Sequence, residues 1–320
     1  MSKETKPELK IQLTKETAHL DSGNLDYLHI GQETRRFNPV VVVPGFTQGI
    51  EVLEDFGIHL TQQGQREVFV LDQLQRQHRT LESLHPLERL RQGVEEQADA
   101  LVGFLANNEL TDRPIDFVTN SLGASIAVRA AEIAHNQGWK SFSSDEGSRM
   151  VFISPAGSNN KEFILSLGGR FIWWMAKNTP SGKYLDPKGE MMKTGVKNAL
   201  DDLKKTVNEV RALARSRIPY ERLGEIGIKP FILAYPGDQL MPYRIMGSNL
   251  ETNLENLSGV ASVVGGYDVG ARNYSEFKKK TGLNGKAAKE AWVHHYRSAD
   301  HSDMQSHPER TASSVLQILN

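Results

Sequence analysis

Short, nearly continuous apolar runs recur along the chain and alternate with stretches whose apolar residues are spaced three or four positions apart. Runs of the first kind are typical of strands buried on both faces, and their alternation with helical patterns is typical of a mostly parallel sheet. We therefore predict an α/β fold with helices on both faces of a parallel sheet. The strands are expected at residues 40–43, 67–71, 115–119, 150–154, 231–235 and, less regularly, 292–296.

Three further segments extend this pattern. Residues 9–13 and 25–30 alternate between apolar and polar positions, which predicts an antiparallel hairpin at an edge of the sheet, before its parallel part. Residues 309–319 have the spacing of a final helix.

The spacing between predicted strands indicates two insertions. About 75 residues separate the strands at 150–154 and 231–235, far more than a crossover needs. We predict a first core segment at 1–156, a helical cap at 157–228, and a second core segment at 229–320 that contains another insertion around 247–291. Within the cap, residues 196–214 form an amphipathic pattern. Trp173 and Trp174 either line an apolar substrate pocket or fill the core of the cap.

Composition removes several classes of function. The 320 residues include 38 Lys and Arg against 39 Asp and Glu, so a net charge of -1 leaves no broad positive field for nucleic acid or an anionic membrane. Cysteine is absent, which excludes disulfides and thiolate catalysis. The first ten residues are charged and lack the apolar core of a secretory signal, so we expect a cytoplasmic protein without membrane insertion.

A serine lies at the junction between a predicted strand and a predicted helix. Ser121 follows the strand at 115–119 after one residue, and a helical pattern begins directly behind it. Thr119 and Gly123, two positions before and after the serine, are small, as a sharp strand-to-helix turn requires. Such a turn presents the serine oxygen beside a helix N-terminus, which stabilises negative charge. Serine is also a common N-cap, so this pattern alone fits a nucleophile and a helix cap about equally.

The residue types that activate a serine follow later strands. Asp238 comes shortly after the strand at 231–235, and His301 follows the strand at 292–296. An imidazole removes the serine proton and returns it to the leaving group, while a carboxylate orients the imidazole. We therefore predict Ser121 as the nucleophile, His301 as the base and Asp238 as the acid.

Other residues compete for two of these roles. Asp268 is the rival acid, and His294, His295 and His307 compete with His301. The first two histidines lie within the strand pattern and the third directly precedes a proline, so the loop residue His301 is preferred. Because adjacent strand residues point to opposite faces, His294 and His295 do not chelate a metal together, and we expect neither a metal nor a cofactor.

Two backbone amides are candidates for binding the oxyanion of the reaction. The strand at 40–43 runs into Pro44 and Gly45, a loop able to present backbone amides, and Phe46 is the donor that we expect from it. The amide of Leu122, which directly follows the serine, is the second.

These pieces together resemble the α/β-hydrolase superfamily over nearly the whole chain, in which the triad has the chain order Ser, Asp, His. The matching segments are Pro44-Gly45-Phe46, Thr119-Asn120-Ser121-Leu122-Gly123, Ser154-Pro155-Ala156-Gly157, Gly237-Asp238 with Pro242, and His301 with Pro308. The resemblance implies a capped hydrolase that acts on an ester, or sometimes on an amide, a thioester or a carbon-carbon bond.

The leading hypothesis is a serine hydrolase of the carboxylesterase type. Its partner would be a small-molecule substrate with a small or medium apolar acyl group, cleaved through an acyl-enzyme. The alternatives are a non-catalytic ligand-binding protein with this fold, or a peptidase, thioesterase or carbon-carbon hydrolase.

Overall fold

The computed structural model describes residues 11–21, 23–31, 37–45, 48–72, 86–142, 148–156, 220–233, 262–263 and 303–320, and residues 169, 218, 235, 238 and 279 singly. Its main elements are β1 (Gln12–Leu20), β2 (Gly23–Gly31), β3 (Val40–Val43), α1 (Ile50–Gly64), β4 (Val68–Leu71), α2 (Pro86–Asn107), β5 (Asp116–Asn120), α3 (Gly123–Asn136), a short 3-10 helix (Lys140–Phe142), β6 (Arg149–Ile153), α7 (Tyr220–Glu225), β7 (Lys229–Leu233), β8 (Ser262–Val263), α11 (Asp303–Ser306) and α12 (Pro308–Leu319).

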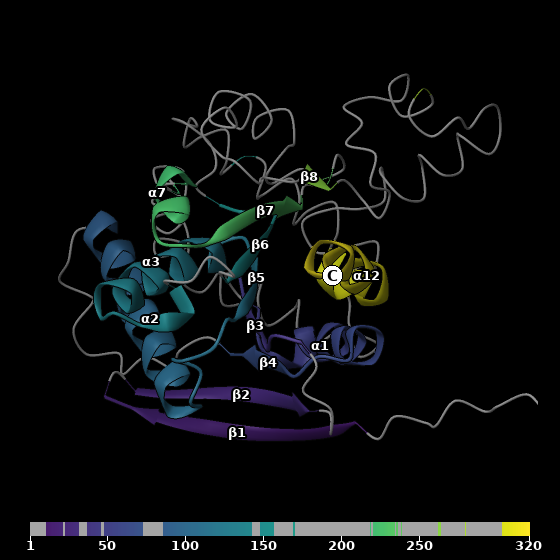
Figure 1. The fold of residues 1–320 in the computed structure, drawn as a ribbon, viewed down its shortest axis with the longest axis horizontal. Coiled ribbons are helices and arrows are strands. Elements are labelled where there is room, and N and C mark those ends of the chain that lie inside the picture. Colours follow the sequence, from purple (N-terminus) through teal and green to yellow (C-terminus); the bar gives the residue numbers. More distant parts are fainter. Residues whose placement is uncertain are drawn as a thin grey trace, which may run out of the picture.

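One sheet of eight strands organises the described part of the chain, in the order β1-β2-β4-β3-β5-β6-β7-β8. The pairs β1 with β2 and β2 with β4 are antiparallel, and every later pair is parallel. This arrangement confirms the predicted edge hairpin followed by a parallel sheet. Figure 1 shows the hairpin at one end of the sheet and β7 and β8 at the other.

Helices cover both faces of the sheet. Helices α2 and α3 pack together on one face, and α1 and α12 pack together on the other (Figure 1). The apolar residues of the strands alternate between the two faces, so each face has its own hydrophobic core. The α/β fold class predicted from the sequence is confirmed.

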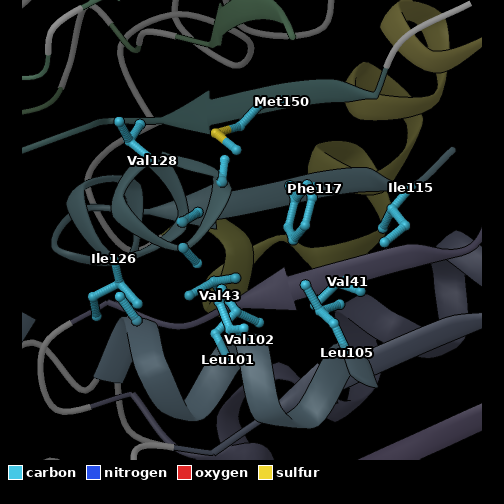
Figure 2. Close-up of a cluster of buried hydrophobic side chains, with 14 of the residues drawn as sticks. Val41, Val43, Leu101, Val102, Leu105, Ile115, Phe117, Ile126, Val128 and Met150 are labelled. Atoms are coloured by element: carbon cyan, nitrogen blue, oxygen red, sulfur yellow. The ribbon is translucent and has the colours of Figure 1, made fainter. Parts of the chain in front are cut away.

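The first core lies between the sheet and helices α2 and α3. One cluster of buried side chains between the sheet and these helices contains Val41 of β3, Phe117 of β5, Leu101 and Leu105 of α2, and Ile126 of α3 (Figure 2). All five side chains are buried. Because these helices are fixed by packing against the middle strands, the turn between β5 and α3 has a rigid support on both sides.

The second core lies between the sheet and helices α1 and α12. Val42 of β3 and Val118 of β5 face Phe56 of α1 and Val315 of α12, and Tyr235, just beyond β7, belongs to the same cluster. The final helix, expected at 309–319, is thus present and completes this face of the sheet.

The strand boundaries match the sequence prediction best in the middle of the sheet. The strand at 40–43 is β3, and β4, β5 and β6 each lie within one residue of their expected limits. Two predictions were wrong in position: the first strand is Gln12–Leu20 rather than 9–13, and β7 is Lys229–Leu233 rather than 231–235. The expected strand at 292–296, the helix at 196–214, nearly all of the cap at 157–228 and nearly all of the insertion at 247–291 lie outside the described residues.

A buried ionic cluster lies at the end of β5 opposite to Ser121. The carboxylate of Asp116, the first residue of β5, accepts a hydrogen bond of 2.8 Å from Arg66 and another of 2.8 Å from Arg149. Arg66 and Asp116 are fully buried, and Arg66 also donates to the carbonyl of Leu319 at 2.6 Å and to the side chain of Asn320 at 3.2 Å. This cluster ties α12 to the middle of the sheet.

Candidate active site

Ser121 occupies the sharp turn between β5 and α3. Its φ is 47°, in the left-handed region that residues with a side chain avoid at a cost of about 1–2 kcal/mol. The Ser121 amide donates to Ile153 of β6 at 3.1 Å, and its carbonyl accepts from Ala156 at 3.1 Å and from Ala124 at 3.3 Å. Helix α3 begins at Gly123 with Leu122 as its N-cap, so Ser121 is not the cap of this helix. These hydrogen bonds on both sides of Ser121 hold its backbone in a costly conformation, which is typical of functional positions.

Gly123 allows α3 to start directly against the end of β3. A Cβ atom at this position would collide with the carbonyl oxygen of Val43 and lie 2.6 Å from the carbonyl oxygen of Pro44. Both obstacles are backbone atoms, in the last residue of β3 and in the residue that follows it, and they cannot easily move aside. The small residue expected two positions after the serine is therefore required by the packing of the turn.

Leu122 is positioned to present its amide at the N-terminus of α3. Its backbone is helical, with φ -62° and ψ -32°. Within the described part of the chain, no hydrogen bond occupies this amide. An amide at a helix N-terminus is a favourable donor to a developing negative charge. Phe46, the other donor expected from the sequence, lies outside the described residues.

The loop that leads to Phe46 is described as far as Gly45. The amide of Gly45 donates to Oε1 of the buried Gln48 at 2.6 Å, and the amide of Gln48 donates back to the Gly45 carbonyl at 3.3 Å. A Cβ at Gly45 would lie 2.9 Å from Oδ1 of Asn120. The loop after β3 thus packs closely against the residue that precedes Ser121.

Around Ser121 lie buried polar atoms that have no hydrogen-bond partner among the described residues. They include both polar atoms of Asn120, and the hydroxyls of Ser125 on α3 and Ser154 after β6. Asn120 is 1% exposed and Ser154 is fully buried. Unsatisfied buried groups are uncommon in folded proteins, and a catalytic role is one of the explanations for them. No sequence pattern indicates this feature, because it depends on which groups find partners after folding.

Asp238 lies beyond the carboxyl end of β7, which is separated from β5 by β6 alone. It is 2% exposed, and its amide donates to the carbonyl of Tyr235 at 3.0 Å in a tight turn. Burial raises the pKa of Tyr235 well above its ordinary value, and the negative charges of Asp303 and Asp238 add to this shift. Asp238 is therefore a buried residue at this edge of the sheet, and its role as the acid stays a prediction.

His301 lies outside the described residues, as do its rivals His294 and His295, and the rival acid Asp268. His307 is described: it is the N-cap residue of α12, and its Nδ1 lies 2.9 Å from the hydroxyl of Ser306. Trp173 and Trp174, the expected pocket residues, also lie outside the described part. Among the described residues, Ser121 and Leu122 lie together at one turn, and Asp238 lies at the same edge of the sheet.

The described residues contain no group of three His, Asp or Glu side chains that could hold a metal ion. Nor does any described helix have the length and apolar character needed to cross a membrane.

Comparison with known proteins identifies the fold. No family model matches the sequence, and no curated protein matches it. Among solved structures, a membrane phospholipase A described as a novel bacterial virulence factor is 16% identical, with 96% of this chain and 86% of that chain covered and a TM-score of 0.61. A putative lipase from Acinetobacter baumannii AYE is 14% identical, with 96% and 91% covered and a TM-score of 0.60.

The match to a third solved structure covers both chains almost completely. It is the 2-hydroxy-6-oxo-6-phenylhexa-2,4-dienoate hydrolase from Rhodococcus sp. strain RHA1, which is 12% identical, with 97% and 99% covered and a TM-score of 0.59. Together with the parallel sheet and the strand-to-helix turn at Ser121, these likenesses show that the chain has the α/β-hydrolase fold.

Proposed function

We propose that this protein is a serine hydrolase that cleaves carboxylic esters of small to medium apolar acyl groups. The observation that carries the proposal is the left-handed backbone of Ser121 at the turn between β5 and α3. If the serine had only a structural role, the protein would be more stable with glycine at this position, because glycine adopts this conformation without strain. The retained strain is accounted for if the hydroxyl has a chemical task.

The proposed mechanism uses three side chains and two amides. His301 removes the proton of Ser121 as the serine oxygen attacks the ester carbonyl carbon, and Asp238 orients the imidazole. The amides of Leu122 and Phe46 bind the oxyanion that forms. His301 then protonates the departing alcohol, which leaves an acyl group on Ser121, and a water molecule activated by the same histidine releases the acid.

The proposed substrate class is supported by the similar structures. Two of the similar structures are described as a phospholipase and a putative lipase, which favours an ester. We further propose that the segment 157–228 is a cap over the site and that Trp173 and Trp174 contact the acyl group. We also propose a cytoplasmic location.

A fluorophosphonate probe tests the nucleophile. We expect covalent labelling of the wild-type protein and none of Ser121→Ala. Ser154→Ala is the matched control, because Ser154 is a second buried serine with a left-handed backbone at the end of the adjacent strand. Labelling that survives in Ser121→Ala, or that requires Ser154, would contradict the proposal.

A panel of p-nitrophenyl esters of graded acyl length tests the reaction. We expect turnover of the shorter esters, with loss of kcat by about 10³-fold or more in Ser121→Ala and in His301→Ala. If labelling fails while a small ligand raises the melting temperature, the alternative of a non-catalytic binding protein replaces the proposal. If labelling succeeds but no ester is cleaved, an amide, a thioester or a carbon-carbon bond is the substrate.

A further inference from the structure

A buried carboxylate that the proposed mechanism does not use lies two residues after His301 in the sequence. Asp303, the first residue of α11, is fully buried. It forms an ion pair with Arg310 through two nitrogens of the guanidinium, with Nε at 3.2 Å from Oδ2. The hydroxyl of Thr311 donates to the same Oδ2 at 3.1 Å, and Nδ1 of His307 lies 3.4 Å from Oδ1.

The same cluster continues to the strand end that carries the candidate acid. The hydroxyl of the buried Tyr235 donates to Oγ1 of Thr311 at 3.4 Å. The carbonyl of Tyr235 in turn accepts the amide of Asp238 at 3.0 Å. A chain of hydrogen bonds therefore connects Asp303 through Thr311 and Tyr235 to Asp238.

Stability alone is a weak reason for this cluster. Desolvation of a carboxylate and a guanidinium costs several kcal/mol each, and apolar residues of similar size are often as stabilising. Helix α12 already packs on the sheet through the buried side chains of Val315, Leu316 and Leu319. The ionic cluster adds directional hydrogen bonds, which fix relative positions that apolar contacts leave free.

We propose that Asp303 is a positioning residue: its contacts fix the start of α11 relative to Asp238, and through the chain they position His301, two residues before Asp303 in the sequence. This inference rests on the proposed function. Asp303 itself touches neither the substrate nor the reacting atoms, and it acts through the histidine.

A second ionic cluster provides a matched control. Asp116 is also fully buried, and its partner Arg149 is 24% exposed, close to the 19% of Arg310. This cluster lies at the opposite end of β5 from Ser121. The variants Arg310→Met and Arg149→Met each remove one partly buried guanidinium, near to and far from the site. Asp303→Asn is compared with Asp116→Asn, which also removes the carboxylate that pairs with Arg66 and so is the more severe change of the two.

The experiment measures kcat and KM on the best p-nitrophenyl ester, well below the melting temperature of each variant. We expect Asp303→Asn to lower kcat about 10- to 100-fold, as a small displacement of a catalytic group does, and to change KM by less than about twofold. Asp116→Asn should lower the melting temperature while kcat stays within about twofold of wild type. Thr311→Val, which removes only the hydroxyl between Asp303 and Tyr235, should lower kcat in the same direction and keeps the test valid if Asp303→Asn does not fold.

A double-mutant cycle with His301→Ala gives the decisive readout. If Asp303 acts through the histidine, Asp303→Asn has no further effect on kcat in the His301→Ala background. Equal effects in both backgrounds, or equal losses of kcat in the Asp303 and Asp116 variants, would overturn the positioning role. Full activity of Ser121→Ala or His301→Ala would instead overturn the proposed function, so the two failures are distinguishable.

Discussion

Ser121 and Ser154 follow neighbouring strands of the sheet, and both adopt the left-handed backbone conformation, with φ of 47° and 45°. The amide of Ser121 donates to Ile153 of β6, and the amide of Ser154 donates to Leu233 of β7. Two strained serines therefore follow the ends of the neighbouring strands β5 and β6. Helix α3 begins two residues after Ser121.

The strain at these serines is measurable by comparing glycine with alanine. We expect Ser121→Gly and Ser154→Gly to be more stable than the corresponding alanine variants by about 1 kcal/mol, because glycine tolerates positive φ. Urea unfolding measures the difference. At Ser125, inside α3, the order should reverse by about 1 kcal/mol, since glycine weakens a helix. Equal stability of the glycine and alanine variants at Ser121 would contradict the strain.

The turn at Gly123 should not accept a side chain. We expect Gly123→Ala to abolish labelling by the fluorophosphonate and to lower the melting temperature, because the new methyl group collides with the carbonyls of Val43 and Pro44. Gly224→Ala is the control: it lies in α7 with open space around it, and alanine should stabilise that helix by up to about 1 kcal/mol. Labelling of Gly123→Ala to the same extent as the wild-type protein would refute the requirement for glycine at this position.

Asn120 offers a case in which stability and activity are expected to diverge. Both polar atoms of its buried amide have no partner in the described part of the chain, so Asn120→Leu should raise the free energy of unfolding by about 1 kcal/mol while lowering ester turnover. Asn108→Leu should destabilise instead, because that amide donates to Phe104 at 2.9 Å and accepts from Tyr27 at 3.3 Å. Urea unfolding and ester assays measure both effects. A destabilised Asn120→Leu would show that the amide finds partners in solution.

The Asp116 cluster should contribute strongly to stability. Asp116→Ala leaves the buried guanidinium of Arg66 without its carboxylate, and breaking a buried pair in this way costs about 3–5 kcal/mol. Chemical denaturation measures the loss. Replacing Glu95, which pairs with Arg129 at the surface, should cost at most about 1 kcal/mol. Similar losses at the two positions would contradict the role of burial.

Tyr27 should make stability depend on pH in the alkaline range. Burial, together with its 2.6 Å hydrogen bond to Glu16, raises the pKa of Tyr27 to about 12 from an ordinary value near 10. The folded state thus favours the neutral phenol, so this stabilisation is complete below about pH 10 and is lost as the pH rises toward 12. Urea unfolding at several pH values should show a shallower alkaline decline in Tyr27→Phe than in wild type. Parallel curves for the two proteins would be the contrary result.

The middle of the sheet could be predicted because its strands are buried on both faces and read as continuous apolar runs. The first strand was misplaced because β1 is an edge strand, most of whose side chains are exposed, so its sequence carries little apolar alternation. The start of β7 was missed because Lys229 and Pro230 resemble a strand boundary. In the described structure β8 pairs with β7 only at Ile232 and Leu233, so Pro230 lies where a missing amide is tolerated.

The parts of the candidate site that depend on local geometry could be predicted from the sequence. The serine, the glycine two positions later and the helix start all follow from one short segment, and the structure places them together. The cluster of Asp303, Arg310, Thr311 and Tyr235 was missed because it joins residues 76 positions apart, and no local pattern marks such a contact. The roles of Asp238 and His301 remain predictions.

The hydrogen bond from Arg66 to the carbonyl of Leu319 spans 253 positions of sequence. While the chain is being synthesised, the face of the sheet that α12 covers must stay uncovered until the last of these residues leaves the ribosome. Val42, Val118 and their apolar neighbours are then accessible to water and to chaperones. Folding of the second core therefore waits until α12 has been synthesised, whereas the core under α2 and α3 can form earlier during translation.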